Sequence, residues 1–255
     1  MISYQVSNQI ALIGLDNPPA NAICEELLSQ LIDCMDRASD DDDVRAVVLH
    51  SEQPKRFCSG LDLRLLHEAD ESDVRRLLQR LYMEVYEAQY RLGKPTIAAI
   101  EGAARGGGMT VAISCDVIVA AEQATFGYPE IDIGVLPAIH YSHLPEIVGR
   151  HRAFELLFSG RTFDAHEAYR IGLLGRVANA GCALRDALEL AGTFAQKPRE
   201  TLRVGRRAFI DALGKGSHRA RIEHAVDTFC AIAGTADAQE GIRAFTEKRR
   251  PNWHA

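Results

Sequence analysis

The chain has 255 residues, of which 47% are hydrophobic, and its 29 lysines and arginines against 35 aspartates and glutamates give a net charge of −6. This is the composition of a globular protein with a large core, and its acidic balance argues against a surface that coats nucleic acid, although a local basic patch could still bind a phosphorylated ligand. Six cysteines without a C-x-x-C pair, no signal-like N-terminus and no run of 18 apolar residues predict a cytoplasmic protein with reduced thiols and no membrane span.

Short apolar runs alternate with amphipathic stretches along the first two thirds of the chain. The predicted strands cover residues 10–15, 44–49, 96–100 and 117–121. The predicted helices between them cover residues 25–38, 72–92 and 106–114. Beyond about residue 150 the strand pattern almost disappears and helices follow one another. The sequence therefore predicts an α/β core over residues 1–195 and a helical C-terminal region over residues 196–255.

Two junctions between a predicted strand and a predicted helix have unusual sequences. Residues 56–64 (RFCSGLDLR) form a short turn, and residues 101–110 (EGAARGGGMT) contain three consecutive glycines. The first turn of a helix leaves backbone N–H groups without internal acceptors, and glycine permits another backbone to approach closely. Each junction by itself is compatible with a structural turn, but two in one chain favour an oxyanion-binding site. Neither matches a nucleotide-binding motif.

A third segment, residues 126–137 (FGYPEIDIGVLP), places one carboxylate among apolar, glycine and proline residues. Partial burial of Glu130 would raise its pKa toward the range that suits proton transfer. A solvent-facing loop glutamate explains the same pattern, so both interpretations stay open at this point.

These segments together resemble the crotonase (enoyl-CoA hydratase/isomerase) superfamily. The resemblance rests on four motifs in the expected order and on an early N-P-x-x-N-A loop, and it spans nearly the whole chain. The matching residues are 17–22 (NPPANA), 57–63 (FCSGLDL), 102–109 (GAARGGGM) with Cys115 and Asp116, 126–130 (FGYPE) and 240–249 (EGIRAFTEKR). The resemblance implies a β-β-α spiral core with a helical C-terminal oligomerisation region, acyl-CoA substrates, a homotrimer or dimer of trimers, and no metal or redox cofactor.

The resemblance also implies roles for individual residues. The backbone N–H groups of Leu61 and Gly107 would form an oxyanion hole for the thioester carbonyl, and Glu130 would transfer protons. The two-carboxylate hydratases have a second glutamate 20 positions earlier, where this chain has Thr110. A threonine hydroxyl cannot be an acid or base at neutral pH but can hold a water. A helix residue bonded to its own backbone is the alternative for Thr110.

Coenzyme A is strongly anionic, so cationic residues should be concentrated where it binds. Family positions that contact CoA match Ala20, Ala22, Ser59, Arg64 and Lys248, the first two through their backbone. The alternative for the two cations is an ordinary solvated position on the surface.

The segment after Pro137 departs from the liver-type hydratases. It contains His140 and His143, which either line the acyl pocket, one of them as a proton donor, or are ordinary residues of a helix. Two histidines without a third ligand do not make a convincing metal site.

The sequence thus predicts an enoyl-CoA hydratase or isomerase that stabilises a thioester enolate and uses a single glutamate. The alternatives are another enolate reaction, either decarboxylation or retro-aldol cleavage, and a catalytically weak relative that binds acyl-CoA or RNA. The presence of Glu130 argues against a pure binding protein, and the absence of a segment dense in lysine and arginine argues against RNA.

Overall fold

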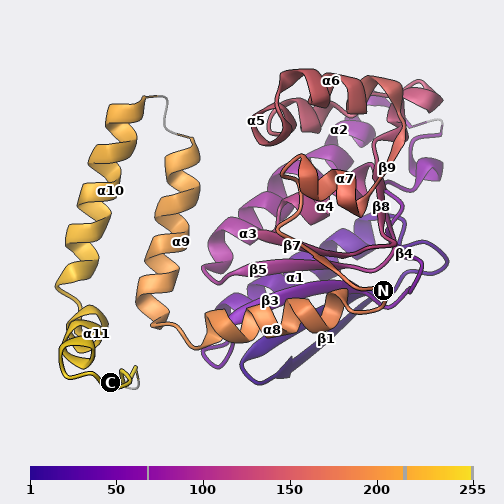
Figure 1. Ribbon diagram of the computed structural model, residues 1–255. Helices are drawn as coiled ribbons and strands as arrows, with labels where there is room; N and C mark the ends of the chain where they lie inside the picture. Colours follow the sequence, from indigo (N-terminus) through magenta and orange to yellow (C-terminus); the bar gives the residue numbers. More distant parts are fainter. Residues whose placement is uncertain (68, 215–216, 254–255) are drawn as a thin grey trace.

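The computed structural model describes residues 1–67, 69–214 and 217–253 (Figure 1). Two β-sheets and the helices around them form the main body of the molecule. The helices α9 (Arg199–Leu213), α10 (His218–Ala233) and α11 (Ala236–Thr246) lie beside this body and are called the C-terminal arm (Figure 1).

The larger sheet has six strands in the order β1-β2-β3-β5-β7-β10. Only β1 and β2 pair in antiparallel fashion, and the other neighbours are parallel. The strands of this sheet are β1 (Ile2–Ser7), β2 (Ile10–Leu15), β3 (Ala46–Ser51), β5 (Thr96–Ile100), β7 (Val117–Ala121) and β10 (Arg176–Ala178).

The smaller sheet has the order β4-β6-β8-β9. Its strands have three residues each and are β4 (Arg56–Cys58), β6 (Ala103–Arg105), β8 (Thr125–Gly127) and β9 (Thr162–Asp164). The chain enters the large sheet and then the small one in each turn, as β3 then β4, β5 then β6, and β7 then β8. This repetition builds the β-β-α spiral that the resemblance implied, and it stacks the successive strand ends at one edge.

The helices of the main body connect these turns, and α8 packs against the larger sheet. They are α1 (Glu25–Asp40), α2 (Glu71–Gln79), α3 (Val85–Leu92), α4 (Gly107–Ile113), α5 (Leu144–Val148), α6 (Arg150–Ser159), α7 (Ala165–Arg170) and α8 (Ala183–Ala195). A π-helical segment, η2 (Arg80–Glu84), joins α2 to α3. The short 3-10 helices are η1 (Leu63–Leu65), η3 (Pro129–Ile133) and η4 (Ala138–Tyr141).

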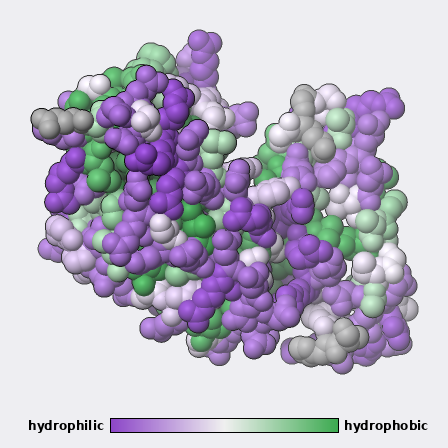
Figure 2. All heavy atoms as spheres, turned by 180° about the vertical axis from the view of Figure 1, so that it is seen from behind, coloured by the Kyte–Doolittle hydropathy of each residue, from purple (hydrophilic) through white to green (hydrophobic). Residues whose placement is uncertain are grey.

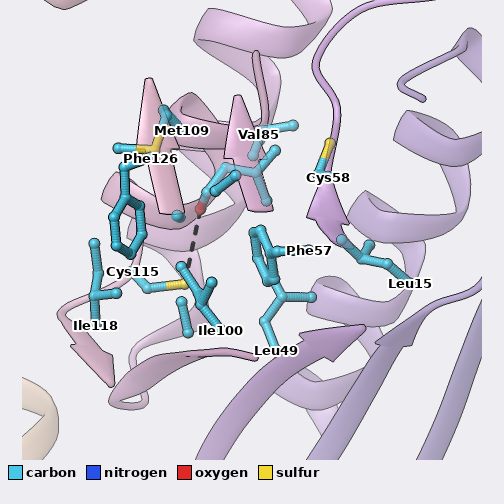
Figure 3. Close-up of a cluster of buried hydrophobic side chains, with 14 of the residues drawn as sticks. Leu15, Leu49, Phe57, Cys58, Val85, Ile100, Met109, Cys115, Ile118 and Phe126 are labelled. Carbon is cyan, nitrogen blue, oxygen red and sulfur yellow. Dashed lines mark hydrogen bonds between the residues drawn. The ribbon is translucent and has the colours of Figure 1, made fainter. Parts of the chain in front are cut away.

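Alternation along the strands separates two hydrophobic clusters on the faces of the larger sheet. In β3, Ala46 and Val48 pack against α8, whereas Val47 and Leu49 belong to the cluster on the opposite face. This second cluster fills the space between the two sheets, where Phe57 and Phe126 are fully buried (Figure 3). A period of two residues therefore decides which face each side chain covers.

Most predicted elements are confirmed. Three of the four predicted strands have the expected bounds, but β3 starts and ends two residues later than predicted. Val44 is apolar and buried, yet it lies in a turn in which its N–H donates to Asp41 O at 3.1 Å, so hydrophobicity alone shifted the prediction. The predicted helix over residues 72–92 is helical throughout, with the π-helical segment η2 between α2 and α3.

The sequence prediction missed β1 and the very short strands, which have too few residues to show an alternation. All six cysteines are free thiols, as expected. Helix α8 ends at Ala195 and α9 begins at Arg199, while the division of the chain into units 1–195 and 196–255 stays a prediction.

Candidate active site

In the first unusual junction, the backbone N–H of Leu61 points away from the adjacent segment around Ile23. Gly60 O accepts a hydrogen bond from Ile23 N at 2.8 Å, and Asp62 N donates to Ile23 O at 2.9 Å. In this parallel bridge Ile23 bonds to Gly60 and Asp62, the residues before and after Leu61. The N–H of Leu61 itself therefore points away from Ile23. Gly60 has a φ of 94°, which a side chain would strain.

The second junction brings the N–H of Gly107 to the same place. Gly107 is the first residue of α4, and Gly106 before it has a φ of 48°. A Cβ on Gly107 would lie 3.4 Å from Leu61 N, and a Cβ on Gly60 would lie 3.2 Å from Gly107 N. Neither N–H donates to an acceptor in the described part of the chain. Two adjacent free donors of this kind can bind an oxyanion.

The third glycine of the run permits the two junctions to touch. A Cβ on Gly108 would lie 2.5 Å from Cys58 O, which is closer than any side chain tolerates. The three glycines thus allow the backbone after β6 to approach the backbone after β4.

Glu130 approaches the glycine run from the third segment. It lies in η3, and its Oε1 would be 2.8 Å from a Cβ on Gly106. Its Oε2 is buried and has no hydrogen-bond partner among the described residues. Burial raises the pKa of Glu130, because a carboxylate loses its hydration there. A partly buried carboxylate beside two free N–H donors is arranged for proton transfer rather than for solvation.

Thr110 lies on α4, one turn beyond the free N–H of Gly107. Its backbone N donates to Gly106 O at 3.3 Å. Its Oγ1 is buried and bonds to no atom of the described chain, unlike Thr228, whose Oγ1 donates to His224 O at 2.8 Å. The interpretation of Thr110 as a helix residue bonded to its own backbone is therefore wrong, and the hydroxyl is available for another group.

His140 and His143 contact each other and the site. His140 Nδ1 lies 3.2 Å from His143 Nε2, and the His140 ring packs edge-on against Tyr128, with centroids 4.5 Å apart. Burial and the neighbouring His143 lower the pKa of His140 to about 3. His140 is therefore neutral at physiological pH, so it cannot act there as an imidazolium acid.

The comparisons with known proteins show the family to which the chain belongs. Residues 5–255 match the family model of enoyl-CoA hydratase/isomerase. The chain belongs to the enoyl-CoA hydratase/isomerase family. It is an enzyme of this type, and the predicted relationship to the crotonase superfamily is confirmed.

Relatives of similar length cover almost the whole chain. A probable enoyl-CoA hydratase of Bacillus subtilis is 33% identical over 257 residues, covering 99% of this chain and 98% of its own. A crotonyl-CoA hydratase of Syntrophomonas wolfei is 30% identical over 254 residues, covering 99% and 97%. The structure of an enoyl-CoA hydratase of Mycobacterium smegmatis superimposes with a TM-score of 0.94 at 30% identity, covering 100% and 99%. The predicted crotonase fold is confirmed.

The residues that match CoA contacts in the enoyl-CoA hydratase/isomerase family fall into two places. Ala20 and Ser59 lie next to the junction that contains Leu61, where Ser59 N donates to Ala20 O at 3.0 Å, and Ala22 O accepts from Asn17 Nδ2 at 2.8 Å. Arg64 is exposed, and its guanidinium chelates the Asp62 carboxylate, with Nη2 2.6 Å from Oδ2. These four residues belong to the neighbourhood of Leu61.

Lys248 lies elsewhere. It follows α11 in the C-terminal arm, far from β4, β8 and α4 in Figure 1. Within one copy of the chain, Lys248 therefore does not lie near Leu61 and Gly107.

Sequence reasoning missed several residues that shape the site. The pKa values of Tyr82 and Tyr128 are both raised, first by burial and then by the charge of Glu130, so both phenols lie near this carboxylate. Leu81 of the π-helical segment and Ile23 would each lie 3.2 Å from a Cβ on Gly107. Tyr128 belongs to a matched motif and could have been found, whereas nothing in the helical pattern distinguishes Tyr82.

The structure also bears on membrane insertion and on metal binding. No helix in the described ranges is long and apolar enough to cross a membrane. Residues 1–67, 69–214 and 217–253 contain no group of three or more histidine, cysteine, aspartate or glutamate side chains placed to hold a metal ion.

Proposed function

We propose that this enzyme adds water to the double bond of a 2-enoyl-CoA thioester, with Glu130 as its only proton-transfer group. The observation that carries the proposal is the meeting of three elements: the free N–H groups of Leu61 and Gly107 and the buried carboxylate of Glu130 beside Gly106. The relatives named as hydratases support the same reaction.

In this mechanism the thioester carbonyl oxygen accepts hydrogen bonds from Leu61 N and Gly107 N. Ionised Glu130 removes a proton from a water, and the hydroxyl adds to the β-carbon while the electron pair of the double bond moves toward the carbonyl. The two N–H groups stabilise the enolate, and such a donor contributes roughly 3–4 kcal/mol to the transition state. Glu130 then returns the proton to the α-carbon. The free Oγ1 of Thr110 holds the attacking water.

Double-bond isomerisation is the second candidate, and the threonine at position 110 favours it. An isomerase removes a proton from one carbon and returns it to a nearby one, and a single carboxylate suffices for both steps. The same enolate and the same oxyanion hole serve this reaction. Neither reaction needs a cofactor, since CoA is part of the substrate.

CoA binding is proposed to use the backbone of Ala20 and Ala22, together with Ser59 and Arg64. Lys248 joins them only if it comes from another copy of the chain, because within one copy it lies far from Leu61 and Gly107. A homotrimer or a dimer of trimers supplies such copies. The exposed apolar side chains of the C-terminal arm support self-association, and Figure 2 shows hydrophobic residues among polar ones on it. His140 and His143 are proposed to line the acyl pocket as neutral groups.

Glu130→Gln tests the proposed function. We expect turnover of crotonyl-CoA to fall by at least ~100-fold, the lower range for general acid–base catalysis, with KM nearly unchanged. The exposed Glu146 of α5 provides a matched control, and Glu146→Gln should retain wild-type turnover. A Glu130→Gln enzyme with wild-type turnover would show that another group moves the proton.

The pH dependence gives a second readout of the same variant. Because Glu130 must be ionised and its pKa is raised, wild-type activity should fall on the acid side at a pH above the ordinary glutamate range. Ionising a buried carboxylate costs stability as pH rises through the folded-state pKa. Glu130→Gln should therefore increase the free energy of unfolding at pH 8, and this gain should shrink toward acid pH. Urea titrations at several pH values measure it.

A further inference from the structure

A cavity of about 220 Å³ lies between the main body and α9 of the C-terminal arm. One wall is the turn between α3 and β5 with the residues before β3, and the other wall is the first half of α9. The two walls touch around the cavity: a Cβ on Gly93 would lie 3.3 Å from Arg203 Cγ, and the Arg207 guanidinium lies 5.2 Å from the Tyr90 ring centroid. This cavity is enclosed by two elements that are more than 100 positions apart in the chain.

The side chains around the cavity carry charge of one sign. Six cations line it, and no carboxylate of a described residue is part of its wall. The cations are Arg45, Arg91, Lys94, Arg199, Arg203 and Arg207. Such a concentration is unexpected in a protein whose net charge is −6.

Only half of these cations have an ion-pair partner. The three pairs are Arg91 with Asp36, Arg199 with Asp42, and Arg203 with Glu200. Arg45, Lys94 and Arg207 lie within ion-pair distance of no carboxylate in residues 1–67, 69–214 and 217–253. Lys94 is 8% exposed and donates to backbone carbonyls at the end of α1, among them Asp41 O at 2.6 Å.

The cations also disfavour one another. The pKa of Lys94 and the pKa of Arg45 are both lowered, first by burial and then by the charge of Arg199, while the carboxylates of residues 40–42 oppose the shift at Lys94 and Asp237 opposes it at Arg45. Arg45 donates to Lys197 O at 2.7 Å, so it is held at the cavity by a neutral acceptor. An anion in the cavity would relieve this repulsion, and at Arg203 it would compete with Glu200.

The cavity is separate from the junctions that contain Leu61 and Gly107. Residues 93–95 line the cavity and immediately precede β5, whereas the glycine run follows the other end of this strand. A strand of five residues is roughly 17 Å long. A ligand in the cavity therefore does not touch the thioester site.

We propose that this cavity binds a phosphate-bearing anion, held by Arg45, Arg203 and Arg207, which links α9 to the main body. Guanidinium groups match the oxygens of a phosphoryl group in pairs, and several of them around one pocket suit a multiply charged anion. Bound phosphate bridges the two walls, so it stabilises the position of the C-terminal arm.

Calorimetric titration of the full-length chain with inorganic diphosphate tests the proposal, at an ionic strength held constant with sodium chloride. Wild-type protein should show saturable binding. Arg203→Gln combined with Arg207→Gln should weaken it by at least ~10-fold, because two charged hydrogen-bond donors to the anion are removed. Arg219 provides the matched control, because it is an exposed arginine of α10 paired with Glu223 at 2.8 Å. Arg219→Gln should bind diphosphate as wild type does.

Absence of saturable diphosphate binding to wild-type protein would overturn the proposal, as would equal weakening in Arg219→Gln. Hydrogen exchange of the wild-type protein decides the matter even if the double variant misfolds. Diphosphate should protect residues 90–95 and 199–207, and protection confined to residues 59–64 would assign the anion to the CoA site instead.

Parallel titrations with inorganic phosphate and with adenosine 3′,5′-bisphosphate identify the source of the phosphoryl group. Sensitivity of nucleotide binding to the double variant would assign a nucleotide to the cavity. Sensitivity of inorganic phosphate or diphosphate alone would assign a free anion. Hydration of crotonyl-CoA by the double variant should remain near the wild-type rate, so loss of anion binding is distinguishable from loss of the proposed activity.

Discussion

Phenylalanines of the main body and of the C-terminal arm have opposite environments. Phe57 and Phe126 are completely buried between the two sheets, whereas Phe209, Phe229 and Phe245 are 67%, 75% and 86% exposed. In the described residues of the arm, Ala244 is the only apolar residue that is buried. Large apolar side chains stabilise a fold only when water is excluded from them. The main body therefore has its own core, whereas the arm leaves these large apolar side chains exposed in a single copy of the chain.

Glycines show the same contrast at the scale of one atom. A Cβ on Gly107 would meet three groups within 3.4 Å, whereas a Cβ on Gly205 of α9 would meet nothing within 4 Å. At Gly107 the main body uses glycine where two backbones approach each other, whereas Gly205 of the arm has no neighbour that requires a glycine. Replacing glycine should consequently impair the protein at the crowded positions of the main body and stabilise it at Gly205 of the arm.

The largest effect is expected for Gly107→Val. The new side chain would crowd Ile23 and Leu81 and fill the space beside Leu61 N, where the thioester oxygen is proposed to bind. Loss of an oxyanion donor costs about 10²- to 10³-fold in turnover, so we expect at least a ~100-fold decrease with the fold retained. Circular dichroism and crotonyl-CoA hydration measure the two properties. A folded variant with near wild-type turnover would remove Gly107 from the oxyanion hole.

Phe229→Asp combined with Phe245→Asp tests whether the arm's apolar face is covered by other copies. Burying one such side chain contributes about 1.5–3 kcal/mol, so the double variant should self-associate at least ~10-fold more weakly. Sedimentation equilibrium over a range of concentrations measures the change. Arg221→Asp, which alters an exposed polar residue of the same helix, should not affect it. A monomeric wild-type protein, or a double variant that assembles normally, would contradict this role of the arm.

Thr110→Val should have a smaller effect and separates the two candidate reactions. It removes the unpaired hydroxyl at almost constant volume. We expect hydration to fall about tenfold, in line with a hydrogen bond of roughly 1–1.5 kcal/mol, while 3-enoyl-CoA isomerisation is little changed. Thr228→Val, in the arm, should affect neither activity. Equal hydration by Thr110→Val and wild type would mean that the water is held by another group.

The smallest effect is expected for Gly205→Ala. Alanine is favoured over glycine in a helix interior by about 0.8–1 kcal/mol, and the added methyl group meets no neighbour. Hydrogen exchange of residues 199–213 should slow accordingly. Gly108→Ala should destabilise the protein instead, because its Cβ would lie 2.5 Å from Cys58 O. Destabilisation by Gly205→Ala would show that the arm is packed more tightly at this position than the single chain indicates.

The sequence by itself determined the order of elements and the segments that form the candidate site. Periodic apolar runs located β2, β5 and β7, the unusual junctions marked the segments of the candidate site, and the resemblance to the crotonase superfamily assigned Leu61 and Gly107 within them. These features are local, since a side-chain period or a glycine run acts over a few residues. Each segment could therefore be found without knowing what lay opposite it.

The tertiary structure decided which of these segments meet. It placed Leu61 N beside Gly107, put the carboxylate of Glu130 against Gly106 and left Lys248 on the remote arm. It also excluded a bond from the Thr110 hydroxyl to its own helix, because a free hydroxyl is recognised only when all neighbouring acceptors are in place. The six cations around the α9 cavity lie between residues 45 and 207, and no local pattern connects them. Such sites depend on long-range packing, which brings together residues that no short window of the sequence contains.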